Sequence, residues 1–270
     1  MLLTRLVGEA SCHLYERERG GRAYGGSCRG FEAAQVGSAR CIEVGTDFTL
    51  PSERDLGVVL TIGMTPYEVF RTYLQEQEKQ VETGHWGYYK HNMVTGFASA
   101  ATHILHAAGI AFAAKLRKAA VVTVAYCGDS ATKEADFWEG IEFAAQHQLP
   151  LICICEQSDL SSSLQSLKFL QSMAGLTYDC VNGSDVVLVY LAMQAAVRHA
   201  REGLGPFLLE MRVRRQEEER NEDDPLLCCK RYLEEQGAWD DEWASGLRAR
   251  LEYEVEQAMR DAVRDVVRTE

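Results

Sequence analysis

Residues 128–159, GDSATKEADFWEGIEFAAQHQLPLICICEQSD, decide the fold together with the apolar run that precedes them. That run, AVVTVAYC at residues 120–127, is Val-rich, has the length of a strand and stops at a glycine, so it predicts a buried strand. Residues 134–148 then carry apolar side chains at helical spacing, and a second apolar run covers residues 151–155. The stretch therefore predicts one strand, helix, strand unit.

A crossover of this kind makes its two strands parallel, so the turns that follow them leave the sheet at the same edge. These turns are polar: Asp129 follows the first strand, and Gln157, Ser158 and Asp159 follow the second. Open α/β sheets bind ligands at the carboxyl ends of their strands. The sequence therefore predicts a ligand site at this edge.

A second unit of the same kind follows along the chain. Residues 177–181 predict a strand, Ser184 or Asp185 can cap the next helix, Gly203 ends that helix, and residues 206–213 predict a further strand. Repeated alternation of strands and helices predicts an α/β fold. We expect a doubly wound, mostly parallel sheet flanked by helices.

Three further helices are expected outside these units. Thr65, Pro66 and Glu68 supply a cap, a first-turn proline and a capping-box acid. The Ala-rich residues 98–114 form an apolar stretch that is too short to span a bilayer comfortably. They therefore predict a buried helix. Residues 241–267 predict a long amphipathic helix.

The chain length and charge limit the classes of function. With 270 residues and no linker-like break, we expect a single domain over residues 1–270. It would comprise an N-terminal arm (1–56), a short charged loop (214–225) and a C-terminal helical segment (226–270). The 28 basic and 40 acidic residues give a net charge of −12, which disfavours nucleic acid and anionic membranes as partners and leaves a basic protein possible.

The first 21 residues contain charges too early for a secretory signal and acids that argue against a transit peptide, so we expect a cytoplasmic location. None of the nine cysteines forms a CxxC pair, which argues against zinc. Cys127, Cys153 and Cys155 lie inside apolar strands and are expected to be core thiols.

Six segments, in order along nearly the whole chain, resemble one family. That family is the alpha subunit of the thiamine diphosphate-dependent decarboxylating component of 2-oxo acid dehydrogenase complexes, of the pyruvate, branched-chain and acetoin types. The segments are GFEAAQVGSA, ERDLGVVLTIGMTPYEVF, HILHAAGIAFAAKLR, GDSATKEADFWEGIEFAAQHQLP, VNGSDVVLVYLAMQAAVRHAREGLGPFLLEM and DPLLCCKRYLEEQGAWDDEW. The resemblance implies a thiamine diphosphate-binding fold.

The same resemblance implies a cofactor, thiamine diphosphate, anchored through Mg²⁺. The family's metal ligands fall on Asp129, Ser158 and the backbone carbonyl of Leu160. Oxygen ligands of this kind suit Mg²⁺. Arg54 matches an arginine that pairs with the diphosphate, and Ser130 and Ala131 extend the cofactor-binding turn that begins at Asp129.

His91, in the loop GHWGYYKHN, matches a histidine near the family's active centre, so the resemblance implies a catalytic hydrogen bond to substrate or intermediate. The expected partner is a beta subunit, which carries the glutamate that activates the cofactor, in a heterotetramer. An acyltransferase core is a further expected partner. For Asp129 alone, the residues also allow a plain helix cap after a strand.

Several positions depart from the family. Glu53 replaces a tyrosine, Ser130 replaces a glycine, Ser158 replaces an asparagine, and Glu156 stands where some members carry arginine. Ala98 and Ala100 replace a serine and a bulky residue that seat the cofactor. The charged loop lacks the family's histidine, and no histidine follows His199.

Two hypotheses stay open at this point. The chain is an active alpha subunit that needs a beta subunit, or a catalytically impaired paralogue that acts as a structural or regulatory subunit. A hydrolase or nucleotide binder has no support, because GxGxxG, GxxxxGK[ST] and GxSxG are absent from the sequence.

Overall fold

A computed structural model describes residues 1–19, 28–78, 86–94, 100–158, 173–214 and 222–267. Its centre is a five-stranded sheet in the order β1-β2-β3-β5-β4, with every neighbouring pair parallel. The strands are β1 (Phe48–Leu50), β2 (Thr123–Gly128), β3 (Leu151–Gln157), β4 (Thr177–Asn182) and β5 (Phe207–Arg212). The predicted doubly wound parallel sheet is confirmed.

The two predicted crossovers are present. Helix α6 (Ala135–Gln146) joins β2 to β3, and α8 (Val186–Arg201) joins β4 to β5. Of the two expected caps for α8, Asp185 is the one used, because its side chain accepts hydrogen bonds from the backbone N–H groups of Val187 and Leu188. Gly203, at φ +73°, follows the end of the helix as expected.

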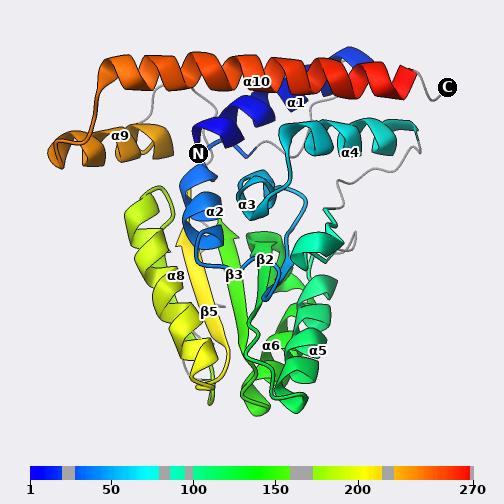
Figure 1. Cartoon of the computed structure of the whole chain (residues 1–270). Helices are drawn as coiled ribbons and strands as arrows, with labels where there is room; N and C mark the ends of the chain where they lie inside the picture. Colours follow the sequence, from blue (N-terminus) through cyan, green and yellow to red (C-terminus); the bar gives the residue numbers. More distant parts are fainter. Residues whose placement is uncertain (20–27, 79–85, 95–99, 159–172, 215–221, 268–270) are drawn as a thin grey trace.

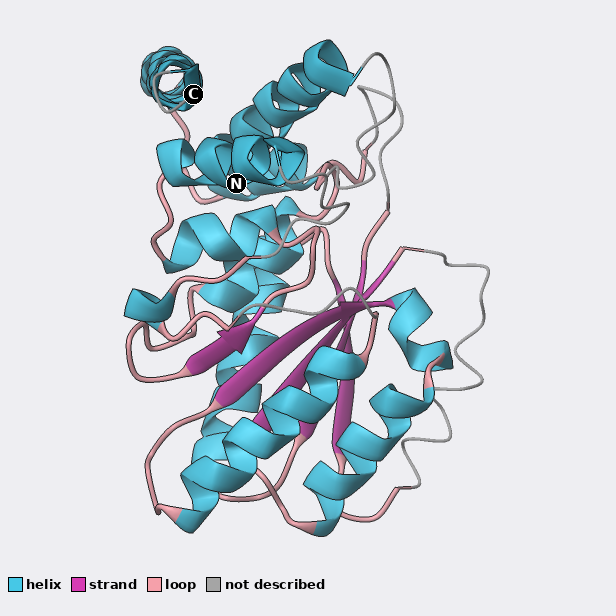
Figure 2. Ribbon diagram, turned by 90° about the vertical axis from the view of Figure 1, so that its right-hand side faces the viewer, coloured by secondary structure: helices cyan, strands magenta, loops and turns pink. Residues whose placement is uncertain are grey.

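Helices cover both faces of the sheet (Figure 2). On one face lie α6 and α5 (Thr102–Leu116). On the other lie α8, α2 (Glu32–Ala39) and α3 (Leu56–Ile62). Since successive residues of a strand point to opposite faces, β2 and β3 contribute to both hydrophobic clusters and are buried along almost their whole length.

A further layer of helices lies across the end toward which the strands point (Figure 1). It contains α1 (Leu2–Arg19), α4 (Pro66–Glu78), α9 (Pro225–Glu235) and α10 (Asp241–Val267). The predicted helices α4 and α10 are confirmed, and Glu68 bonds back to the backbone and hydroxyl of Thr65 as a capping box does. Helix α1, inside the expected N-terminal arm, was not predicted.

Strand β1 was not predicted either, because three residues are too few for a periodic pattern. A buried aspartate fixes its start: Asp47 accepts hydrogen bonds from the backbone N–H of Glu43 and Val122 and pairs with Arg201 at 2.6 Å. This links the entry to β1 with the start of β2 and the end of α8. The short strand therefore depends on contacts between distant parts of the chain.

The predicted core thiols are confirmed: Cys127, Cys153 and Cys155 are buried. Among the described residues, no group of three or more His, Cys, Asp or Glu side chains could hold a metal ion. No helix of the described part is long and apolar enough to cross a membrane. The boundary of one domain at residues 1–270 stays a prediction.

A buried ion cluster ties the N-terminal helix to the rest of the fold. Arg5, on α1, donates to Glu32 and to Asp224, each at 2.7 Å, and all three side chains are at most 10% exposed. Glu32 begins α2, and Asp224 caps α9. Removing the arginine leaves two carboxylates buried without their cation.

We therefore expect Arg5→Met to lower the free energy of unfolding by about 3–5 kcal/mol, since that is the usual cost of breaking a buried pair. Arg260, which pairs with Glu256 on the exposed face of α10, provides the matched control. Arg260→Met should cost less than about 1 kcal/mol, as exposed pairs do. Urea denaturation checks both variants, and equal losses would contradict a structural role for the buried cluster.

Candidate functional site

The predicted site lies where β2 and β3 end side by side. Gly128, the last residue of β2, is level with Glu156 of β3, so Asp129 and Ser158 follow neighbouring strand ends. Both side chains are half-buried. The structure thus brings these two expected metal ligands to one edge of the sheet.

Asp129 is not a helix cap. Helix α6 begins six residues later, at Ala135, and the side chain of its N-cap residue Glu134 makes no capping bond. The short 3-10 turn η2 (Asp129–Lys133) has Gly128 at its N-cap and also lacks a side-chain cap. Within the described part of the chain, the Asp129 carboxylate has no hydrogen-bond partner, and a side chain added at Gly128 would enter open space.

A third strand end brings the expected diphosphate partner to the same edge. Residues 51–55, which we name the Arg54 turn, follow β1 directly. Arg54 is half-buried and has no ion-pair partner among the described residues. The turn is held from both sides: Gln35 donates to the carbonyl of Arg54 at 3.1 Å, and Trp86 donates to the carbonyl of Glu53 at 3.0 Å.

The remaining expected cofactor residues differ in exposure. Ser130 is exposed, whereas Ala131 is fully buried in the core against α5 and α6, so only the backbone of Ala131 can face a ligand. Ala100 is exposed. Leu160, with Asp159 and Ala98, lies outside the described residues.

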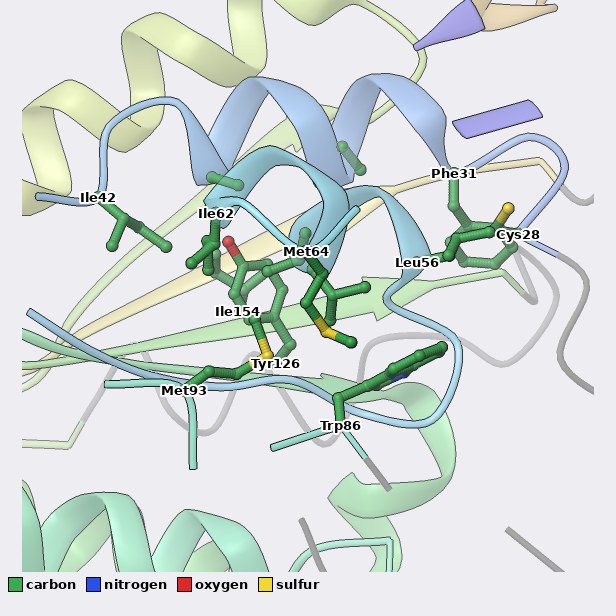
Figure 3. Packing of buried hydrophobic residues seen from close by; sticks show 14 of the residues in the cluster. Cys28, Phe31, Ile42, Leu56, Ile62, Met64, Trp86, Met93, Tyr126 and Ile154 are labelled. Atoms are coloured by element: carbon green, nitrogen blue, oxygen red, sulfur yellow. The ribbon is translucent and has the colours of Figure 1, made fainter. Parts of the chain in front are cut away.

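Beneath the Arg54 turn lies a buried polar cluster that the sequence did not predict. Asp55 and Glu156 both accept hydrogen bonds from the amide nitrogen of Gln35, at 3.3 and 3.4 Å. Ser38 of α2 bonds to the hydroxyl of Tyr126 at 3.0 Å beside them. Figure 3 places Tyr126 between the α2–α3 side and the strands.

Burial governs the protonation of this cluster. It raises the pKa of Asp55 to about 6, although the N–H of Ser52 donates to that carboxylate. Burial also raises the pKa of Glu156 well above its usual value, and the charge of Asp55 raises it further. Burial likewise raises the pKa of the Tyr126 phenol. Burial and the charge of Asp55 therefore both favour the protonated form of Glu156.

His91 does not lie at the carboxyl edge, and its expected catalytic role stays a prediction. It precedes Met93, which bridges Thr49 of β1, and Thr49 is level with Val124 of β2. Asp129 lies five residues beyond Val124, roughly 16 Å further along the sheet at ~3.3 Å per residue.

The ring of His91 lies instead against Gly63, at the end of α3, and against Tyr88. In Figure 3, Trp86 lies on the side toward which the strands point and Met93 on the opposite side. The loop that contains His91 therefore runs away from the edge. His85, the other histidine of that loop, lies outside the described residues.

The described residues fit a magnesium diphosphate in their chemistry. Asp129 and Ser158 offer the hard oxygens that Mg²⁺ prefers, and Arg54 offers a cation for phosphate oxygens. Glu53, next to Arg54, is exposed, and Glu156 is buried beneath the turn. Among the described residues, neither acid forms an ion pair with Arg54.

Comparisons with known proteins identify the family of this chain. The family model described as "Dehydrogenase E1 component" matches residues 1–269. The chain is 32% identical to the 2-oxoisovalerate dehydrogenase subunit alpha of Bacillus subtilis (strain 168), over 99% of this chain and 86% of that protein. It is also 32% identical to the 3-methyl-2-oxobutanoate dehydrogenase subunit alpha of Mycobacterium tuberculosis, over 88% and 70%.

Among solved structures, a putative thiamin diphosphate-dependent enzyme from Mycobacterium smegmatis superposes with a TM-score of 0.46 and 14% identity, over 67% of this chain and 31% of that chain. This partial superposition is not needed for the family assignment. The family model and the two alpha subunits cover nearly the whole sequence, in agreement with the six segments recognised there. The chain belongs to the dehydrogenase E1 component family.

Proposed function

We propose that this chain is the alpha subunit of a thiamine diphosphate-dependent 2-oxo acid dehydrogenase, active only together with a beta subunit. Membership of the family and the names of its curated relatives support the reaction class. We further propose that Arg54, Asp129, Ser130, Ala131 and Ser158 bind the cofactor. Asp129, Ser158 and the carbonyl of Leu160 would bind Mg²⁺.

The observation that carries this proposal is the unpaired Asp129 carboxylate. A carboxylate that caps no helix and bonds to no described residue, beside a strand end with open space in front of it, is suited to a ligand. Ser158 lies on the neighbouring strand end, and Arg54, which has no ion-pair partner among the described residues, on the next. Three strand ends thus offer two oxygen ligands and one cation.

When bound, thiamine diphosphate supplies the nucleophilic carbon and the electron sink for decarboxylation. The residues of this chain orient and neutralise the diphosphate: Asp129 and Ser158 through the metal, and Arg54 directly. The acid that activates the cofactor is expected on the beta subunit. A cytoplasmic location also belongs to the proposal, and the described cysteines, all of them free thiols, support it.

Asp129→Ala should abolish the thermal stabilisation by thiamine diphosphate with Mg²⁺ that the wild type shows when co-expressed with a beta-type chain. A ligand present at 100 times its dissociation constant stabilises by about 2.7 kcal/mol, which is readily measured. Asp179→Ala, at an exposed aspartate of β4, should retain the full shift. An unchanged shift in Asp129→Ala would place the metal elsewhere.

His91→Ala should leave the affinity for the cofactor within about twofold of the wild type, because the histidine lies far from Asp129 along the sheet. Isothermal titration of thiamine diphosphate with Mg²⁺ measures this affinity. The companion measurement is the turnover of a 2-oxo acid by the variant, compared with that by the wild type. A loss of more than about tenfold in kcat, equal to 1.4 kcal/mol, would support the catalytic role that the sequence implied.

Release of CO₂ from a 2-oxo acid separates the active subunit from an impaired paralogue. The co-expressed pair should decarboxylate 2-oxoisovalerate or pyruvate only when thiamine diphosphate is present, and this chain alone should not. Cofactor binding without CO₂ release, with the glutamate of the beta chain intact, would refute the active assignment. The same assay across 2-oxo acids identifies the substrate.

A further inference from the structure

The turn that carries Asp129 is held by hydrogen bonds to its backbone carbonyl groups. The hydroxyl of Thr132 donates to the carbonyl of Asp129 at 2.7 Å. The indole N–H of Trp138 donates to the carbonyl of Thr132 at 2.9 Å. The N–H of Glu134 donates to the carbonyl of Ala131 at 3.0 Å. Three carbonyl groups of η2 therefore have donors, and none of these hydrogen bonds uses the Asp129 carboxylate.

The turn is also attached to the hydrophobic core. Trp138 lies in the first turn of α6 and packs against the core cluster that contains Ala131 and Phe137, both of which are 0% exposed. The rings of Trp138 and Phe137 meet edge to face, with their centroids 5.6 Å apart. The indole that holds the carbonyl of Thr132 is therefore itself fixed by packing.

The strand that leads into the turn is held by a buried histidine. Strand β1 ends level with Ala125, so among the described residues the last three residues of β2 have a strand neighbour only in β3. His103 of α5 is 3% exposed, and its Nε2 lies 2.6 Å from the carbonyl of Tyr126. Because a carbonyl only accepts, Nε2 must carry the hydrogen. His103 thus supplies a donor beyond the point where β1 stops.

A further bond joins the two helices on this side of the sheet. The hydroxyl of Thr102, the first residue of α5, donates to Asp136 in the first turn of α6 at 2.6 Å. The starts of both helices are therefore linked to each other. Between them they hold the end of β2, through His103, and the turn after it, through Trp138.

We propose that Thr132 and Trp138 are positioning residues, which hold the Asp129 turn in one conformation and leave its carboxylate free for the metal. This inference rests on the proposed function. A ligand side chain on a preformed turn loses less conformational freedom on binding than one on a loose turn, so the affinity is higher. The bond from a threonine hydroxyl to a backbone carbonyl nearby in sequence selects the conformation of the turn.

The indole N–H of Trp138 reports the state of the turn without any ligand. The chain contains only four tryptophans, so the indole ¹⁵N–¹H spectrum is simple, and Trp138→Phe assigns the resonance. Thr132→Val keeps the branched shape and removes the hydroxyl. The Trp138 resonance should shift or broaden in this variant, because the carbonyl that it bonds is no longer held. In Thr132→Ser, which keeps the hydroxyl, the resonance should stay at the wild-type position.

Thr72 provides the matched control. It is half-buried like Thr132, and its hydroxyl donates to the carbonyl of Glu68 at 3.0 Å, but it lies in α4. Thr72→Val therefore removes the same kind of bond from a different part of the fold. The Trp138 resonance should be unchanged in this variant.

Cofactor affinity is measured by calorimetry on the complex with a beta-type chain. Thr132→Val and Trp138→Phe should each bind thiamine diphosphate with Mg²⁺ about fivefold more weakly than the wild type, the effect of losing one net hydrogen bond. Thr132→Ser and Thr72→Val should stay within about twofold. Because the loss is one of positioning, saturating cofactor should return kcat of Thr132→Val to within about twofold of the wild type.

Three results would overturn the proposal. The first is wild-type affinity in Thr132→Val. The second is an equal loss in Thr132→Ser, which would assign the effect to the shape of the side chain and not to its hydroxyl. The third is an unchanged Trp138 resonance in Thr132→Val. Absence of cofactor binding by the wild-type complex would refute the proposed function instead, while the resonance still decides whether the hydroxyl of Thr132 holds the turn.

Discussion

The parallel pairing of β2 with β3 is the constraint on which the site depends. Its register sets Gly128 level with Glu156, so the two polar turns leave the sheet together. The same register fixes which side chains point to which face. Cys127 and Cys155 enter the core beneath α5 and α6, while Tyr126 and Ile154 enter the core on the other side. A slip by one residue would exchange the faces and send Glu156 away from Gln35.

Alternation along β3 changes the interpretation of Glu156. In the sequence it is an acid two residues before an expected metal ligand, and a negative charge there would repel a diphosphate. In the structure its side chain lies beneath the Arg54 turn, where burial and the charge of Asp55 raise its pKa. Both effects favour the neutral form of the side chain. Gln35 donates both to Glu156 and to the backbone turn that carries Arg54.

The N-terminal half of the chain positions the site from outside the two strand, helix, strand units. Gln35 on α2 holds the Arg54 turn, and Arg5 on α1 anchors α2 and α9. Asp47 fixes the entry to β1. These contacts join residues far apart in sequence. The site therefore depends on the packing of α1 and α2 as much as on the sheet that carries Asp129.

Local sequence patterns were enough to predict an element wherever the interactions that form it lie within a few residues. The apolar run before Gly128, the spacing of α6, the capping box at Thr65 and the cap at Asp185 each act within a few residues, and the structure confirms them. The three-residue β1 could not be predicted, because its stability comes from Asp47 and from pairing with β2. The position of His91 could not be predicted for a related reason: a bridge from Met93 to Thr49 turns its loop away from the edge.

The sequence by itself determined the parallel sheet, the edge at which Asp129 and Ser158 emerge, and membership of the family, because periodicity and ordered segments are properties of the chain. Only the tertiary structure decided that Asp129 caps no helix, that Arg54 reaches the same edge, and that Glu156 meets Asp55 and Gln35. These outcomes depend on how distant segments pack and on the burial that results, and burial is what sets the charge of a carboxyl group.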